Sequence, residues 1–204
     1  MGKYLFRIGI IIVMSALSVA QFGCSSSPSS RFYVLSSPST KGPAVSPPVE
    51  SRCLSIGIGP IKMAAYLDRT QIVTRNSANE LQVAEFDRWA EPLKENFTRV
   101  LSQNLSTHLC TKTVVVFPWR GTIPVDYRIE MDVLRFDGTL GGNVSLEAWW
   151  MVFSGDGKIM LLARKSNLSE PAGGGDYKSL VSAQGRTLEK LSREIAEAIK
   201  ILPK

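Results

Sequence analysis

The segment that decides the fold runs Val144-Ser-Leu-Glu-Ala-Trp-Trp-Met-Val-Phe-Ser-Gly-Asp-Gly-Lys-Ile-Met-Leu-Leu-Ala-Arg-Lys165. Runs rich in apolar residues flank Gly155-Asp-Gly157, and Asp-Gly between two such runs is a strong signal for a β-hairpin. A two-residue turn at Asp156-Gly157 fixes the strand register. It places on one face Val152 opposite Leu161 and Trp150 opposite Ala163, and on the other face Phe153 opposite Met160, Met151 opposite Leu162 and Trp149 opposite Arg164.

Two adjacent tryptophans in one strand must point to opposite faces of a sheet, because strand side chains alternate. If helices cover the Trp150 face, an apolar patch is left on the other face. Its members are Trp149, Met151, Phe153, Met160 and Leu162. An exposed patch of this composition is typical of a binding surface. The alternative is that the segment Phe32–Leu35 or a loop covers it.

The whole sequence predicts, in chain order, strands, a helix, more strands and a second helix. Short strand patterns occur at 54–60, 71–75, 81–85, 114–117 and 127–133. Apolar residues follow a helical period in two stretches: Leu93, Phe97, Val100, Leu101, Leu105 and Leu109, then Tyr177, Leu180, Val181, Leu188, Leu191, Ile195 and Ile199. Pro92 and Asp176 suit the two helix starts. The predicted fold is α+β, a mostly antiparallel sheet with two amphipathic helices packed on one face.

The first 23 residues have the features of an export signal that ends at a cysteine. Lys3 and Arg7 precede an apolar run from Ile8 to Ala20, and Gly23 stands before Cys24. The run is shorter than the roughly 20 residues that span a bilayer. We therefore predict a lipoprotein signal peptide over 1–23 and lipidation of Cys24. The alternative is an ordinary secretory signal with a chance cysteine, since Gln21 and Phe22 depart from the usual lipoprotein pattern.

The predicted mature chain divides into a tether at 24–30 and a single α+β periplasmic domain at 31–204. Residues 31–51 are partly a Pro/Ser-rich loop, a linker composition. Within them, Arg31-Phe-Tyr-Val-Leu35 reads as a strand, and we expect it to add to a sheet edge.

Charge and motifs argue against nucleic-acid binding and catalysis. After residue 23 the chain keeps 22 of its 24 basic residues and all 18 acidic ones, a formal charge of +4 without a basic cluster. There is one histidine, His108, and no His/Cys/Asp/Glu pattern with metal-ligand spacing. We expect no enzyme activity, no metal and no cofactor.

Two cysteines, Cys53 and Cys110, remain once Cys24 is lipidated. An even number of thiols in an oxidising compartment is consistent with one disulfide. One thiol precedes a predicted strand and the other ends a predicted helix, places that can meet in space. Two buried free thiols are the alternative.

Two further segments carry a family resemblance: Met63-Ala-Ala-Tyr-Leu-Asp-Arg-Thr-Gln-Ile-Val-Thr-Arg75 and Phe86-Asp-Arg-Trp-Ala-Glu-Pro-Leu93. With the cysteine and Phe32–Leu35, they make the chain resemble the ABC-type transport auxiliary lipoproteins of the PqiC (YmbA) type. The motif residues are Tyr66, Leu67, Asp68, Arg69, Arg88, Trp89, Pro92 and Leu93. Family members often have prolines before Tyr66 and at Thr70, where this chain does not.

The resemblance implies an outer-membrane lipoprotein that faces the periplasm, carries acyl chains such as palmitate on Cys24, and forms a homo-oligomeric ring. Its implied partners are a periplasmic MCE-domain protein and an inner-membrane transport component, which together move lipid and support membrane integrity. Ser25 after Cys24 is consistent with outer-membrane sorting.

Three functions compete. The first is a non-enzymatic tether and docking subunit, in which Asp68, Arg69, Arg88 and Trp89 either bind partners or merely fix the start of a helix. The second is a periplasmic lipid carrier, which needs an apolar cavity of several hundred Å3. An envelope hydrolase is the third.

Overall fold

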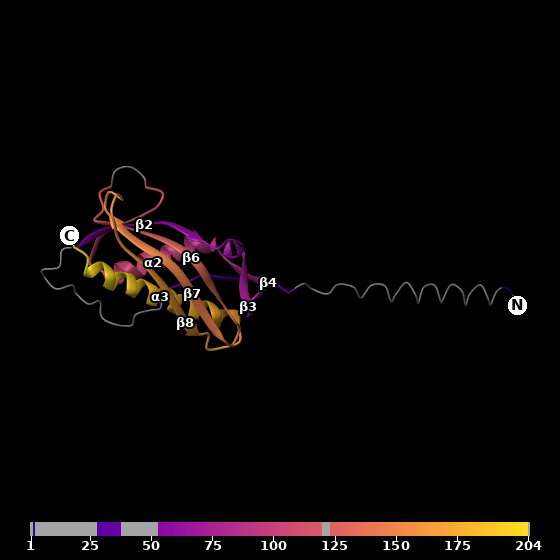
Figure 1. Cartoon of the computed structure of the whole chain (residues 1–204). Helices are drawn as coiled ribbons and strands as arrows, with labels where there is room; N and C mark the ends of the chain where they lie inside the picture. Colours follow the sequence, from indigo (N-terminus) through magenta and orange to yellow (C-terminus); the bar gives the residue numbers. More distant parts are fainter. Residues whose placement is uncertain (1, 3–27, 38–52, 120–122, 204) are drawn as a thin grey trace.

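The computed structural model describes Gly2 and residues 28–37, 53–119 and 123–203 (Figure 1). From residue 28 on, the described part of the chain holds two helices and eight strands, which form an α+β fold. In chain order the elements are β1 (Arg31–Tyr33), β2 (Leu54–Met63), the 3-10 turn η1 (Ala65–Leu67), β3 (Gln71–Ser77), β4 (Glu80–Trp89), α2 (Leu93–His108), β5 (Thr111–Val116), β6 (Tyr127–Gly138), β7 (Asn143–Ser154), β8 (Met160–Pro171) and α3 (Tyr177–Lys200).

The larger sheet has five strands in the order β5-β2-β6-β7-β8. β2 pairs in parallel with both β5 and β6, whereas β7 runs antiparallel to β6 and β8. The expectation of a mostly antiparallel sheet is therefore wrong, and the sheet is mixed. The reason is topological. A long excursion through β3, β4 and α2 separates β2 from β5, and crossovers of this kind join parallel strands.

Both helices lie on one face of the five-stranded sheet, as expected (Figure 1). α2 packs on β2 and β5, and α3 packs on β6, β7 and β8. The helix residues predicted to face the core are buried or pack against it. We call the helix-covered face of this sheet the inner face and the opposite face the outer face. Fully buried Phe97, Phe136 and Trp150 fill the layer between helices and sheet.

The β7–β8 hairpin corrects the predicted register. Phe153 pairs with Met160 as expected, but the register then shifts by one residue, so that Val152 lies opposite Leu162 and Trp149 opposite Lys165. A β-bulge of this kind, common at sheet edges, adds one residue to the edge strand β8. The shift turns Leu162 to the inner face, where it packs against the core.

The smaller sheet has the order β1-β4-β3. β1 adds as an edge strand in parallel to β4, which confirms the expectation for Arg31–Leu35. β3 and β4 contain the predicted strands at 71–75 and 81–85 and form an antiparallel hairpin, and β4 continues beyond the predicted strand to Trp89.

After β1 the chain is fixed by both helices. The Leu35 N–H donates to Oδ1 of the buried Asn96 on α2 at 2.5 Å. On α3, a Cβ at Gly185 would come within 2.7 Å of the Ser36 carbonyl oxygen, so only glycine leaves room for the chain that follows β1. The segment from Arg31 to Ser36 is thus part of the folded body.

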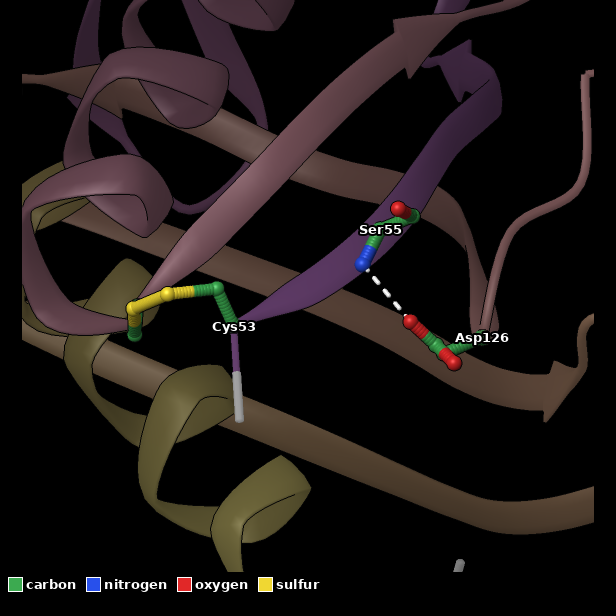
Figure 2. Close-up of a disulfide and its surroundings, with 4 residues drawn as sticks. Cys53, Ser55 and Asp126 are labelled. Carbon is green, nitrogen blue, oxygen red and sulfur yellow. Dashed lines mark hydrogen bonds between the residues drawn. A yellow bond between two sulfur atoms is a disulfide. The ribbon is translucent and has the colours of Figure 1, made fainter. Parts of the chain in front are cut away.

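A disulfide joins Cys53, just before β2, to Cys110, just before β5, 57 residues apart (Figure 2). Beside it, Leu54 N–H donates to the Cys110 carbonyl at 2.7 Å. One step along β2, Ser55 N–H donates to Asp126 Oδ2 at 2.7 Å (Figure 2). The disulfide therefore fixes the starts of two parallel neighbouring strands.

Removing the disulfide with the double variant Cys53→Ala/Cys110→Ala is expected to lower the free energy of unfolding by about 4 kcal/mol, the chain-entropy value for a loop of this length. The denaturant midpoint at equilibrium measures it, and reductant on the wild-type protein is the matched control. An unchanged midpoint in both experiments would show that the disulfide does not stabilise the fold.

Candidate functional site

The first motif segment is held by a buried charge cluster between the two sheets. Asp137 on β6 is fully buried and accepts hydrogen bonds from Tyr66 OH at 2.7 Å, Arg75 Nη2 at 2.9 Å and Arg135 Nε at 2.9 Å. The Arg75 guanidinium also lies 5.9 Å from the centre of the Tyr66 ring. The cluster therefore pins η1 and β3 to the outer face at one end of β6.

The electrostatics of this cluster favour the ionised carboxylate. Burial raises the pKa of Asp137, but hydrogen bonds from Arg75, Tyr66 and Arg135 outweigh it, so the net pKa is lowered. Burial and the hydrogen bond to Asp137 raise the pKa of Tyr66 to about 12. Tyr66 therefore stays a neutral donor at neutral pH. A charged, fully satisfied cluster of this kind is suited to holding two sheets together.

The remaining motif residues divide into buried and exposed groups. Leu67, Trp89 and Leu93 are core residues, and Pro92 caps the start of α2. Asp68 and Arg69 are exposed, and neither side chain forms an ion pair within the described part of the chain. An ion pair that fixes the helix start is thus not seen for these two residues.

Arg88 lies between these groups. It stands on β4 between Phe32 of β1 and Gln71 of β3, and its side chain is half-buried. Its Nε is buried without a hydrogen-bond partner among the described residues. Asp68, Arg69 and Arg88 are therefore the motif residues that the fold explains least.

The outer face carries four of the five residues of the predicted patch. Trp149 is 46% exposed and Met160 is 54% exposed, whereas Met151 and Phe153 are half-buried. Leu162 faces the other way, as described above. The segment Phe32–Leu35 does not cover this patch, because it lies in the smaller sheet and against the helices. We call Trp149, Met151, Phe153 and Met160 the outer-face patch.

Charged residues border the outer-face patch. Asp132 lies opposite Trp149 on β6 and pairs with Lys62 at 3.7 Å. Lys165 lies opposite Trp149 on β8 and pairs with Glu147. An apolar centre with a rim of both charge signs is the usual composition of a protein–protein interface.

Next to the outer-face patch is an aromatic cluster that sequence reasoning missed. Arg128 pairs with Phe153 across β6 and β7, and its guanidinium lies 5.4 Å from the centre of the Trp119 ring. Trp119 in turn packs edge-on against Phe117, with ring centres 5.7 Å apart. A Cβ at Gly57 would come within 2.7 Å of the Trp119 ring. The glycines of the predicted strand at 54–60 were the signal that another group approaches the sheet there.

The single histidine has a structural role. His108 Nε2 lies 3.1 Å from Oε1 of Glu189, which Arg193 also contacts at 2.7 Å. Glu189 is buried at the α2–α3 interface. Across residues 28–37, 53–119 and 123–203, no three His, Cys, Asp or Glu side chains gather to hold a metal ion.

Apart from Gly2, the predicted signal peptide lies outside the described residues, and so does the predicted lipidation residue Cys24. Within the described part, no helix has the length and hydropathy to cross a membrane.

The fold and its surfaces define a disulfide-containing α+β domain whose larger sheet carries helices on one face and an exposed apolar patch on the other. The chain belongs to the family described as the ABC-type transport auxiliary lipoprotein component, whose family model matches residues 33–196. This confirms the resemblance inferred from the motif segments.

Solved structures support the same fold. One is an uncharacterised protein with a TM-score of 0.66 and 18% identity, covering 84% of this chain and 99% of its own. Another is protein XCC0632 from Xanthomonas campestris, with a TM-score of 0.64 and 17% identity, covering 83% of this chain and 94% of its own. A search of curated proteins finds no match.

Proposed function

We propose that this protein is a lipid-anchored, non-enzymatic tether and docking subunit of an envelope lipid transport system. In this role Cys24 is acylated, the domain sits on the periplasmic side of the outer membrane, and its partners are an MCE-domain protein, an inner-membrane transport component and further copies of itself. Membership of a family of ABC transport auxiliary lipoproteins supports the transport context.

The observation that carries the docking role is the outer-face patch. Both helices lie on the inner face, so the patch has no covering element among the described residues. A protein partner that buries Trp149 and Met160 removes apolar area from water without a change in the fold. The Trp119–Arg128 cluster extends the same surface toward the end of the domain that holds the C-terminus.

The alternative, a lipid carrier, requires space between helices and sheet. That layer is occupied by side chains with almost no exposed surface, including Phe97, Phe136 and Trp150. Acyl chains would have to displace them. The structure therefore favours the docking role over the carrier role.

Crosslinking tests the docking role directly. A photoreactive amino acid at position 149 or 160 of the full-length, anchored protein is expected to yield adducts with an MCE-domain protein or with a second copy of this chain. The same amino acid at Ile201, an exposed apolar residue near the C-terminus, is the control. Mass spectrometry identifies the adducts, and labelling from 149 and 160 that is no greater than from 201 would contradict the role.

The variant Trp149→Ala is expected to weaken the association measured with the identified partner by roughly tenfold or more, as for a central aromatic residue in an interface. The variant Ile201→Ala should leave it unchanged. Titration with purified, delipidated protein provides the measurement, and equal affinity of the Trp149→Ala variant and the wild-type protein would count against the patch.

A further inference from the structure

The smaller sheet carries a second group of exposed apolar residues, separate from the outer-face patch. β1 contributes Phe32, which is 66% exposed, and Val34 follows it at 49%. β4 contributes Leu81 at 38% and Val83 at 42%. We call these four residues the hairpin-end group after Leu81 and Val83, which adjoin the turn between β3 and β4. Phe32 lies farther along β4, opposite Arg88.

The register of β1 places this group beside the incoming chain. β1 runs parallel to β4, with Arg31 opposite Asp87 and Tyr33 opposite Trp89. Parallel strands start at the same end, so the chain reaches Arg31 from the side where β4 begins, which is the side of the β3–β4 turn. Figure 1 shows the described residues just before β1, drawn in indigo, at the end of the domain that holds β3 and β4.

Side-chain contacts hold the start of β1 to β4, which limits how far the domain can turn away from the anchored residue. Arg31 Nη2 contacts Asp87 Oδ2 at 2.8 Å, and Tyr33 OH donates to Asp87 Oδ1 at 2.7 Å. From Arg31 to Ser36 the chain is fixed to β4 and then to both helices. The predicted tether at 24–30 is therefore the connection between the anchored residue and this fixed part of the domain.

The predicted tether at 24–30 is short compared with the length of the domain. Arg31 lies seven positions after Cys24, so these two residues lie at most about 25 Å apart when the chain is fully extended. The helix α3 has 24 residues and is therefore about 36 Å long. It begins beside β1, where the Tyr177 and Tyr33 ring centres are 6.4 Å apart, and it ends at the opposite end of the domain. A lipid on Cys24 thus holds the hairpin end toward the bilayer.

Charges at this end have both signs. Arg31 is paired with Asp87, and Glu80 and Glu85 are exposed acids on β4. With these charges, an anionic lipid head group gains little electrostatic free energy at this end of the domain. The attraction to the membrane must therefore come from the apolar side chains. A residue such as Phe32 can bury its ring at the boundary between head groups and acyl chains.

We propose that the hairpin-end group rests on the lipid surface to which Cys24 is anchored, and so orients the domain with its opposite end toward the periplasm. This inference rests on the lipidation of Cys24 in the proposed function. In this orientation the Trp119–Arg128 cluster and the β7–β8 turn point away from the membrane, toward partners.

The test uses p-benzoylphenylalanine in the full-length, anchored protein in native membranes, in place of Phe32 or of Val83. Positions 117 and 159 are the controls, because Phe117 and Ile159 have comparable exposure, 46% and 61%, at the opposite end. After irradiation, lipid adducts are expected from positions 32 and 83 and not from positions 117 and 159. Adducts with protein only from 32 and 83, or equal lipid labelling from all four positions, would overturn the proposal.

Two measurements on the same samples distinguish a wrong orientation of the domain from a missing lipid anchor. Membrane fractionation and the acyl mass on Cys24 report the anchor itself. If the protein is acylated and membrane-bound but positions 32 and 83 give no lipid adducts, the orientation is wrong and the anchor stands. If Cys24 carries no acyl chain, the proposed function is contradicted, and the orientation proposal that rests on it is contradicted too.

Vesicle composition tests the apolar character of the contact. Lipidated protein in phosphatidylcholine vesicles should give the same lipid labelling from position 32 as in vesicles with added phosphatidylglycerol. Labelling that requires the anionic lipid would overturn an apolar contact and indicate a charge-driven one.

Discussion

Replacing Asp137 with asparagine is expected to destabilise the domain by about 3–5 kcal/mol, the usual cost of removing one partner of a buried ion pair. The amide keeps the size of the carboxylate but leaves Arg75, whose side chain is only 19% exposed, without its counter-charge. Because a domain is typically stable by only about 5–15 kcal/mol, the loss is a large share of the total. Denaturant unfolding at pH 7 provides the measurement.

The same cluster makes stability depend on pH. The pKa of Asp137 is lower in the folded protein than the value of about 3.9 in an unfolded chain. Its contribution is therefore complete above that value and is lost as the pH falls through the folded pKa. We expect the melting temperature to drop from about pH 5 downward, and to drop less steeply in Asp137→Asn because that carboxylate is absent.

Asp132→Asn is the matched control on the same strand. Its carboxylate is 41% exposed and lies 3.7 Å from Lys62, a surface pair worth at most about 1 kcal/mol. If Asp137→Asn costs no more than Asp132→Asn, the cluster does not hold the two sheets together.

Periodicity predicted the helices, because each buries one stripe along its whole length. The residues named for α2 and α3 lie in the core or against it, and the side chain of Asp176 accepts from Ser179 N–H at 2.7 Å as a helix cap. A helical period is visible within one continuous segment, so no knowledge of distant contacts is needed to predict it.

Pairing between distant strands could not be predicted in the same way. The parallel neighbours of β2 depend on where the chain returns after α2, which no local pattern encodes. The bulge after Met160 moved Leu162 to the inner face, since a shift of one residue exchanges the faces of a strand. The Asp137 cluster was missed because its members, Tyr66, Arg75, Arg135 and Asp137, come from three segments.

The second large effect is expected at Cys24. A single acyl chain binds a membrane only marginally, and stable anchoring needs two or more signals. Cys24→Ser removes every acyl chain that the proposed mature N-terminus could carry. We therefore expect essentially all of the protein to be lost from the outer-membrane fraction, while the domain keeps its fold.

A second variant separates loss of the anchor from failed export. Fusing residues 25–204 to an ordinary cleavable secretory signal should give a folded periplasmic domain, and formation of the Cys53–Cys110 disulfide reports that folding. The proposed role predicts that the envelope barrier weakens in both variants, because the proposed docking surface is no longer held at the membrane.

Fractionation of cells that carry Cys24→Ser, followed by a barrier assay on the same cells, tests the anchored docking role most directly. The proposed role predicts that the protein is absent from the outer membrane and that the barrier is impaired to the level of a deletion. A variant that still fractionates with the outer membrane and still supports the barrier would contradict it.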